Sequence, residues 1–354
     1  MQEKVLMKGN EAIAEAAILA GCRHYLGYPI TPQTEVAAYM AKKMPKINGV
    51  FLQAESEVSA INMVYGAAAA GMRTMTSSSS PGISLKAEGI SYLAAGDLPC
   101  VIVNIVRGGP GLGGIQPAQS DYFQAVKGGG HGDYHLIVLA PNSVQELAHL
   151  TAEAFNISDE YRIPTMILGD GTLGQMMEPV DLDAIPEPIY ADKPWAARGT
   201  DNKRKKNVVE TLYLEASELE KKVLEREEKY NVVKENLQRY EAHDIDDADI
   251  IISSYGITSR VVETAVKSLR EEGIKVGVIR PITLWPFPEK IFKIIVDCIR
   301  SYSAVCNIFA IILNYSAHAS LLSLRVNAVH LFISADVRAV LYRHPMRLRK
   351  RLRA

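Results

Sequence analysis

The sequence predicts an α/β protein built on parallel sheets, because short apolar runs alternate with helical segments along most of the chain. The connections between these segments are short and rich in glycine, proline and serine, which mark the turns between strands and helices. A length of 354 residues and an apolar fraction of 48% suffice for two domains, each with its own core. We therefore expect two α/β domains joined by a linker.

The first domain is predicted at 1–178. Helical periodicity places helices at 9–20, 35–43, 58–70, 83–95 and 144–155. Short apolar or β-branched runs place strands at 23–26, 50–52, 73–76, 99–106, 136–140 and 164–168. Parallel sheets bind ligands beyond the carboxyl ends of their strands. Four polar residues each follow a predicted strand, namely Thr31, Glu57, Ser78 and Arg107. We therefore expect them to lie at one edge of the sheet.

The segment 179–245 is predicted to be a linker. It begins with a stretch rich in proline and aspartate, and residues 207–243 are highly charged without glycine or proline, which indicates one long helix. A solvated connector and an arm that grips a partner subunit both fit this pattern. A second α/β domain is predicted at 246–354, with a strand at 248–253, a helix at 259–272 and a strand at 276–279.

Composition excludes several classes of protein. The net charge of −1 does not favour binding to nucleic acid or to an anionic membrane, and the chain has no run of 18 apolar residues. No signal-peptide pattern opens the sequence. The four cysteines form no CxxC pair, so we expect no metal site and no iron–sulfur cluster on this chain. This cysteine usage fits the reducing cytoplasm.

A stiff loop at 27–35 follows the first predicted strand. Proline fixes φ near −65° and pushes the preceding residue out of the helical region, so Pro29 and Pro32 bias Tyr28 and Thr31 to extended geometry. Pro32 then suits the first turn of a helix, with Thr31 as its N-cap. A hydroxyl held above a helix N-terminus suits a carboxylate ligand. An ordinary capped turn is the alternative.

Three other local motifs admit more than one interpretation. The GxGxxG pattern at 109–114 lacks an immediate helix and an acidic residue at the end of the next strand, which disfavours a dinucleotide site. The sequence at 169–171 begins like a GDG…N motif, but Asn202 lies in a charged run, so we interpret this match as chance. Glu55 and Glu57 precede an alanine-rich helix. A carboxylate there can favour the helix dipole, or it can be a buried acid with a raised pKa.

Taken together, six segments resemble the α-chain of the 2-oxoacid:ferredoxin oxidoreductases, and most closely the branched-chain, 2-oxoisovalerate (3-methyl-2-oxobutanoate) type. The segments are 27–32 (GYPITP), 53–57 (QAESE), 78–82 (SSSPG), 98–100 (LPC), 107–111 (RGGPG) and 280–286 (RPITLWP). The resemblance covers about residues 1–290. It implies a pyrimidine-type thiamine diphosphate-binding domain and a transketolase C-terminal-like domain, joined by the charged helical linker.

The resemblance also implies an enzyme subunit that is active only with its partners. The implied reaction is the oxidative decarboxylation of a 2-oxoacid with CoA to acyl-CoA, CO₂ and reduced ferredoxin. A branched-chain 2-oxoacid is the expected substrate, with pyruvate and 2-oxoglutarate as rivals and a non-catalytic α/β scaffold as the alternative function. Thiamine diphosphate is shared with a β subunit that carries the Mg²⁺-binding half and a cluster. A small ferredoxin-like subunit carries further iron–sulfur clusters, and the family pattern admits a γ subunit.

Site roles follow from the same resemblance. Glu57, rather than Glu55, is expected against N1′ of the cofactor's pyrimidine, where a carboxyl group shares its proton. Thr31 is expected to hydrogen-bond the substrate carboxylate or carbonyl oxygen, and Arg107 to pair with the carboxylate or the developing oxyanion. These three are the expected catalytic residues. The other expected contacts are Tyr28, Pro29, Ser79 and Gly82 to the cofactor and Ile30 to the substrate.

The end of the chain departs from the family pattern after about residue 290. Residues 291–354 contain no glycine and finish in a basic run at 347–353. A compact α/β domain without one turn glycine over such a length is unusual. We interpret this tail as a frame-shifted or otherwise aberrant translation, in preference to a nucleic-acid or membrane patch.

Overall fold

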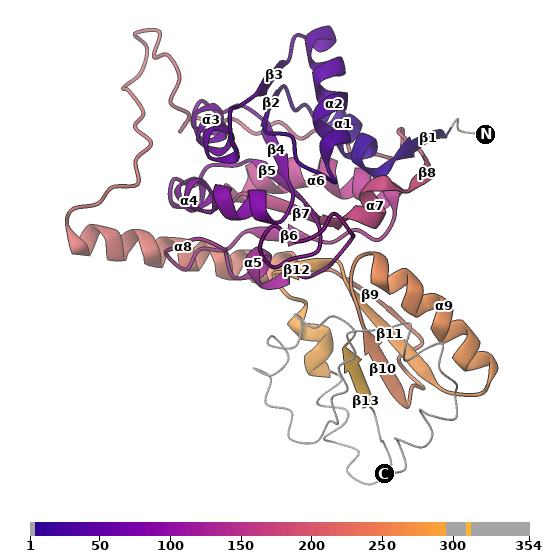
Figure 1. The fold of residues 1–354 in the computed structure, drawn as a ribbon. Helices are drawn as coiled ribbons and strands as arrows, with labels where there is room; N and C mark the ends of the chain where they lie inside the picture. Colours follow the sequence, from indigo (N-terminus) through magenta and orange to yellow (C-terminus); the bar gives the residue numbers. More distant parts are fainter. Residues whose placement is uncertain (1–3, 295–308, 313–354) are drawn as a thin grey trace. The chain divides into compact units, whose positions relative to one another are not determined.

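The computed structural model describes residues 4–294 and 309–312, and the chain divides into two compact units (Figure 1). The first unit runs to Leu237 and takes in Thr283–Pro286. The second runs from Gln238 to Ile282 and continues from Phe287. The predicted domain boundaries at 178 and 245 stay a prediction. In the part of the chain that the structure describes, no helix is long and apolar enough to cross a membrane.

A seven-stranded sheet forms the centre of the first unit, in the order β12-β6-β7-β5-β4-β2-β3. Neighbouring strands run parallel except at β12, which pairs antiparallel with β6 at one edge. The predicted α/β class with a parallel sheet is therefore confirmed. Both faces of such a sheet are covered, which is why β5 and β7 are buried along their whole length. The strands are β2 (His24–Gly27), β3 (Val50–Gln53), β4 (Thr74–Ser78), β5 (Val101–Val106), β6 (Ile137–Leu139), β7 (Thr165–Asp170) and β12 (Thr283–Trp285).

Helices cover the sheet in two groups, which Figure 1 shows on either side of it. One group packs α1 against α2 and α6, and the other packs α3 against α4. Ser56 and Ser143 begin α3 and α6 as N-caps, because each hydroxyl accepts a hydrogen bond from the backbone N–H three residues on, at 3.2 Å. The helices are α1 (Gly9–Leu19), α2 (Thr34–Lys43), the 3₁₀ turn η1 (Met44–Ile47), α3 (Glu57–Ala69), α4 (Pro81–Ala95), α5 (Tyr122–Val126), α6 (Val144–Tyr161) and α7 (Gly171–Gln175). A two-stranded antiparallel ribbon of β1 (Val5–Lys8) and β8 (Met177–Val180) adjoins them.

The strand order places a switch point between β2 and β4. From β2 the chain moves outward to β3, and from β4 it moves the other way to β5. The loops that follow β2 and β4 therefore leave the sheet in opposite directions at its carboxyl edge. Ligands of open α/β sheets bind at such a switch point, and we call this place the crevice.

Two predictions about the loops of this edge are wrong. Thr31 is not an N-cap, because α2 begins at Thr34 and Gln33 occupies the N-cap position. Ser77 and Ser78 belong to strand β4 and not to the loop after it. The end of β4 is hard to predict because strands are recognised by apolar runs, and this strand ends in two buried serines.

The charged segment forms a shorter helix than predicted. Helix α8 (Ala216–Asn236) ends well before residue 243, and the chain continues into strand β9 (Tyr240–His243). Only Tyr230 and Val233 of α8 are buried. The hydroxyl of Tyr230 accepts a hydrogen bond from the His135 backbone N–H at 3.1 Å, and the His135 ring stacks on Trp285 at 4.6 Å between centroids. This aromatic cluster joins α8 and β12 to the first unit.

The second unit holds a four-stranded sheet in the order β13-β10-β11-β9. Strands β10, β11 and β13 run parallel, and β9 pairs antiparallel with β11. Buried aliphatic side chains fill its core, and the buried Arg280 pairs with Glu241 at 2.9 Å. The elements are β9, β10 (Ile250–Ser253), α9 (Ile257–Glu271), β11 (Val276–Pro281) and β13 (Phe309–Ile312). The hypothesis of an aberrant tail concerns residues that lie almost wholly outside the described ones.

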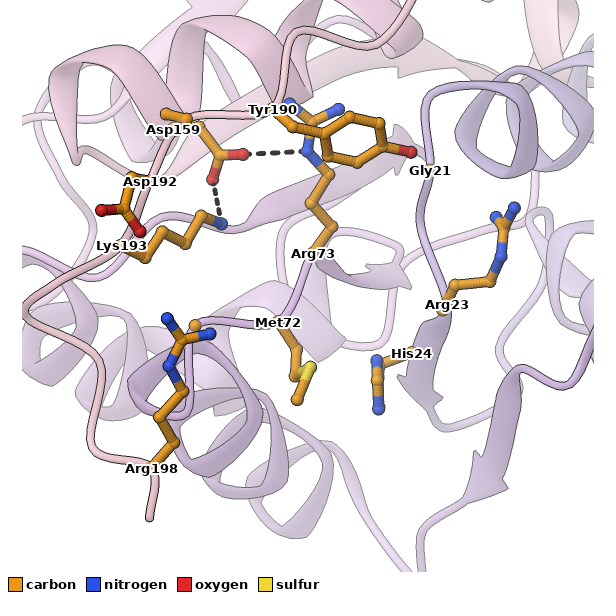
Figure 2. A pocket seen from close by; sticks show the side chains of 12 residues that line it. Gly21, Arg23, His24, Met72, Arg73, Asp159, Tyr190, Asp192, Lys193 and Arg198 are labelled. Carbon is orange, nitrogen blue, oxygen red and sulfur yellow. Dashed lines mark hydrogen bonds and ion pairs between the residues drawn. The ribbon is translucent and has the colours of Figure 1, made fainter. Parts of the chain in front are cut away.

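A buried ion pair anchors the connector that follows β8 to the first unit (Figure 2). Asp159 of α6 binds Arg73 at 2.8 Å and Lys193 of the connector at 2.5 Å, and the Asp159 and Arg73 side chains are each 5% exposed. The Arg73 guanidinium also lies over the ring of Tyr190, 4.9 Å from its centroid. These side chains line a cavity of about 250 Å³. It lies at the amino ends of β2 and β4, at the opposite end of the strands from the crevice.

We expect Asp159→Asn to lower the free energy of unfolding by about 3 kcal/mol, because it leaves the buried Arg73 and the partly buried Lys193 without their carboxylate. Chemical denaturation of the full chain measures this loss. Asp183→Asn, at an exposed position of the same connector, is the matched control and should change stability by less than about 0.5 kcal/mol. Equal effects of the two substitutions would contradict the anchoring role of Asp159.

Candidate functional site

The crevice at the switch point is bordered by four segments that follow the carboxyl ends of neighbouring strands. They come after β2 (residues 28–33), β3 (54–57), β4 (79–82) and β5 (107–121). The strand order thus brings the four expected loops to one edge of the sheet.

The turn after β2 is held from beneath by buried polar groups. Gln33 is fully buried, and its Oε1 accepts a hydrogen bond from the Ser77 hydroxyl at 2.5 Å. The Ser77 hydroxyl is also joined to the Tyr25 hydroxyl at 2.6 Å. The Pro32 carbonyl oxygen accepts a hydrogen bond from Asn10 Nδ2 at 2.8 Å. Because its backbone is pinned on both sides, this turn presents a rigid surface to the crevice.

Arg107 also holds the turn after β2, through hydrogen bonds from its side chain. Its Nη1 donates to the Thr31 carbonyl oxygen and its Nη2 to the Leu112 carbonyl oxygen, each at 3.0 Å. Its Nε is buried and has no hydrogen-bond partner within the described residues. The side chain of Arg107 is thus largely committed to backbone carbonyls, while the Thr31 side chain is exposed at the rim.

Ser80 links the loops that follow β4 and β5. Its hydroxyl accepts a hydrogen bond from the Arg107 backbone N–H at 3.0 Å, and its own N–H donates to Asn104 Oδ1 at 3.1 Å. Ser80 has a φ of +25°, a conformation that non-glycine residues rarely adopt. Strain of this kind persists where surrounding contacts over-determine the backbone, and it is frequent at functional sites.

Glu57 is the buried carboxylate of the crevice. It is the first residue of α3 and is 6% exposed, whereas Glu55 is exposed. The Glu57 side chain makes no hydrogen bond or ion pair with the described residues. A Cβ placed on Gly82 would lie 2.8 Å from Glu57 Oε1 and 2.1 Å from Ser78 Oγ. The carboxylate and the hydroxyl are therefore close neighbours in the space that the missing side chain of Gly82 leaves open.

Two further hydroxyl groups of the crevice lack partners. Ser78 Oγ and Ser79 Oγ are buried and form no hydrogen bond among the residues that the structure describes. Buried polar atoms in folded proteins almost always have a partner, so unpaired ones at the mouth of a crevice indicate groups that a ligand completes.

The structure brings some of the predicted site residues into contact and leaves others apart. Arg107 contacts the Thr31 backbone, and Glu57 lies against Gly82. Among the described residues, no hydrogen bond or ion pair joins these two pairs. The remaining predicted contacts, at Tyr28, Pro29 and Ile30, are half-buried in the turn after β2. Sequence reasoning missed three residues that shape the site, because a polar side chain reveals its buried position only in the fold: Gln33, Lys86 and Asn104.

Asp170 of the GDG sequence has a local structural role. It ends β7 as the N-cap of α7, and its Oδ1 accepts hydrogen bonds from the backbone N–H groups of Thr172 and Leu173 at 2.8 and 3.1 Å. Burial raises the pKa of this carboxyl group, and these hydrogen bonds oppose the rise. The N-cap role accounts for an aspartate at position 170.

Two family models match the sequence. Residues 15–256 match "Pyruvate flavodoxin/ferredoxin oxidoreductase, thiamine diP-bdg", and residues 248–314 match "Pyruvate:ferredoxin oxidoreductase core domain II". The second match extends beyond residue 290, where we expected the family pattern to end.

Curated relatives span most of the chain. Ketoisovalerate oxidoreductase subunit VorB of Methanothermobacter marburgensis is 52% identical over 285 residues, which cover 80% of this chain and 81% of the relative. 2-oxoglutarate synthase subunit KorA of Methanothermobacter thermautotrophicus is 39% identical over 332 residues, covering 82% of this chain and 84% of the relative.

A solved structure shows the same fold. The 2-oxoglutarate:ferredoxin oxidoreductase from Magnetococcus marinus, with 2-oxoglutarate, coenzyme A and succinyl-CoA bound, superimposes with a TM-score of 0.81 at 28% sequence identity. The match covers 99% of this chain and 65% of that chain, so this chain spans about two thirds of its length.

We expect Gly82→Ala to destabilise the protein by about 1–3 kcal/mol, because the added methyl group overlaps Ser78 Oγ and displaces the Glu57 carboxylate. Thermal unfolding of the full chain measures the loss. Ser78→Ala combined with Gly82→Ala should recover part of the stability, since it removes the closest clashing atom.

The matched control is Gly66→Ala in α3, where nothing lies within 4 Å of the added Cβ. This substitution should stabilise the helix by about 0.5–1 kcal/mol. If both alanines had the same effect, the close approach at Gly82 would not be the cause.

Proposed function

This chain belongs to the 2-oxoacid:ferredoxin oxidoreductase family, and on this premise we propose that it binds the aminopyrimidine half of thiamine diphosphate in such an enzyme. The proposed reaction is the oxidative decarboxylation of a branched-chain 2-oxoacid with CoA to acyl-CoA, CO₂ and reduced ferredoxin. The branched-chain choice is supported by identities of 51–52% to ketoisovalerate oxidoreductase subunits, against 37–39% to 2-oxoglutarate synthase subunits.

The buried carboxylate of Glu57 carries this proposal. Thiamine diphosphate, when bound, supplies a carbanion that adds to the 2-oxoacid carbonyl and then accepts the electrons released with CO₂. The residues of the crevice fit the cofactor, because the Glu57 carboxylate and the buried hydroxyls of Ser78 and Ser79 make no hydrogen bond with the described residues and so have bonds to offer to a ligand. In this assignment Glu57 holds a proton at N1′ of the aminopyrimidine, while Tyr28, Pro29, Ser79 and Gly82 line the same pocket.

Thr31 and Arg107 act together on the substrate in this proposal. The Thr31 hydroxyl is exposed at the rim and hydrogen-bonds the substrate carboxylate or carbonyl oxygen, next to Ile30. Two Arg107 nitrogens already bind backbone carbonyls, so Arg107 holds the Thr31 backbone and acts on the substrate through its positive charge. Oriented donors at a developing negative charge are worth several kcal/mol in the transition state.

A partner subunit completes the site in this proposal. In this proposal the rim of the crevice includes large apolar side chains that are exposed near the starts of α3 and α4 and in the segment after β5, namely Val58, Leu85, Leu112 and Ile115. Apolar side chains that are grouped on a surface mark interaction sites. We assign this rim to a β subunit that binds Mg²⁺, the diphosphate group and a cluster, and further iron–sulfur clusters to a ferredoxin-like subunit, in a cytoplasmic complex that can include a γ subunit.

Glu57→Gln in the complex with its partner subunits should lower kcat for 2-oxoacid decarboxylation by about 10²–10⁴-fold, because the amide cannot exchange a proton with N1′. The measurement is CoA-dependent reduction of ferredoxin. Glu55→Gln, at the exposed neighbour, is the control and should leave kcat unchanged. Full turnover of the Glu57 variant would favour a non-catalytic scaffold.

Substrate preference tests the branched-chain assignment. With the same complex, kcat/KM should be higher for 2-oxoisovalerate than for pyruvate or 2-oxoglutarate. The second carboxylate of 2-oxoglutarate requires a cation to receive it, and apolar substrates do not. A preference for 2-oxoglutarate or pyruvate would move this chain to another branch of the family.

A further inference from the structure

Lys86 is fully buried, although lysine is rarely buried without an anionic partner. Its Nζ donates one hydrogen bond, to the Thr76 hydroxyl at 2.5 Å. Within the described residues, no carboxylate lies within ion-pair distance of Lys86. Burial of an ammonium group with a single neutral partner costs several kcal/mol, so this side chain needs an explanation.

The surroundings of Lys86 lead to Glu57. Lys86 lies one helical turn after Gly82 on α4, so the two residues share one face of the helix. The Gly82 end of that face packs against the Glu57 carboxylate. Thr76, which binds Lys86, and Ser78, which neighbours Glu57, are two apart on β4 and therefore point to the same side of the sheet. Lys86 and Glu57 therefore lie toward the same side of β4, with Thr76 next to Lys86 and Ser78 next to Glu57.

We infer that Lys86 is a positioning residue for Glu57, because its buried positive charge one turn beyond Gly82 holds the Glu57 carboxyl group in the ionised form. The inference rests on the proposed role of Glu57 at N1′ of the cofactor. An ionised Glu57 leaves the shared proton on the pyrimidine nitrogen, which is the form that the proposed chemistry uses. Because Lys86 is fully buried, this inference has it act through Glu57 and not on substrate or cofactor.

The ionisable groups around Lys86 agree with this role. Burial lowers the pKa of Lys86 to about 7, and the charges of Glu57 on α3 and Cys100 before β5 oppose that shift. Burial raises the pKa of the Cys100 thiol to about 12, so this thiol is neutral at physiological pH. Of these two groups, Glu57 and Cys100, only the Glu57 carboxylate is an anion that the charge on Lys86 can attract.

The lowered pKa also sets the sign of a pH effect. Between about pH 7 and about pH 10.5 the unfolded chain binds a proton at Lys86 that the folded chain does not. The free energy of unfolding therefore rises with pH between about pH 7 and about pH 10.5. Below about pH 7 the folded chain carries the buried charge in full, and the destabilisation by Lys86 is greatest. Lys86→Met should remove this dependence, so its unfolding temperature should rise relative to wild type more at about pH 6 than at about pH 9.5.

The decisive experiment is a double-mutant cycle in the assembled complex, read by unfolding temperature. It compares Lys86→Met, Glu57→Gln and the double variant at about pH 6. Coupling predicts that Glu57→Gln destabilises the protein when Lys86 is present and much less when Met replaces it. Additive shifts would overturn the inference. Lys86→Gln, which keeps a donor for Thr76 without the charge, replaces Lys86→Met if that variant fails to assemble.

A second readout separates charge from packing. Isothermal titration with thiamine diphosphate should show that the dissociation constant depends on pH around pH 7 in wild type and that this dependence is lost in Lys86→Gln. Lys42→Met, at an exposed lysine of α2, should leave that pH dependence intact. Retention of the wild-type profile in Lys86→Gln would also overturn the inference. The cycle needs no substrate, so it is decided independently of whether Glu57→Gln abolishes turnover.

Discussion

The close approach of α3 and α4 at Gly82 is the constraint on which the candidate site depends. The absent side chain of Gly82 lets the Glu57 carboxylate and the Ser78 hydroxyl occupy the same small space. Any larger residue there would move one of the two oxygens or separate the helices. The α/β fold thus buries a carboxylate that has no hydrogen-bond partner among the described residues, a state that proteins usually avoid away from functional sites.

The opposite side of the crevice is built for rigidity. The turn after β2 is fixed by Gln33 from below and by Arg107 from the side, and Ser80 ties Arg107 to the loop after β4. Three consecutive strand ends are therefore held in one hydrogen-bonded frame. Such pre-organisation is what positions donors before the charge in a reaction develops, and it accounts for a strained φ at Ser80 being tolerated.

Sequence reasoning identified the parallel sheet, most strands to within two residues, and the set of loops that meet at the crevice. It succeeded there because hydrophobic periodicity and turn residues are local signals. It failed where polar side chains are satisfied by distant partners. Ser77 extended β4 because it binds Gln33 and Tyr25, and the charged segment ended at Asn236 because Tyr240 and its neighbours pair with β11.

The sequence by itself determined the class of fold, the family and the choice of Glu57 over Glu55 as the candidate acid. Only the tertiary structure decided that Arg107 is engaged with the Thr31 backbone and that Lys86 is buried on the Gly82 face of α4. The physical reason is that burial and hydrogen-bond partners are properties of surfaces brought together by the sheet. A lysine in a helix looks the same along the chain whether it faces water or a buried hydroxyl group of a neighbouring strand.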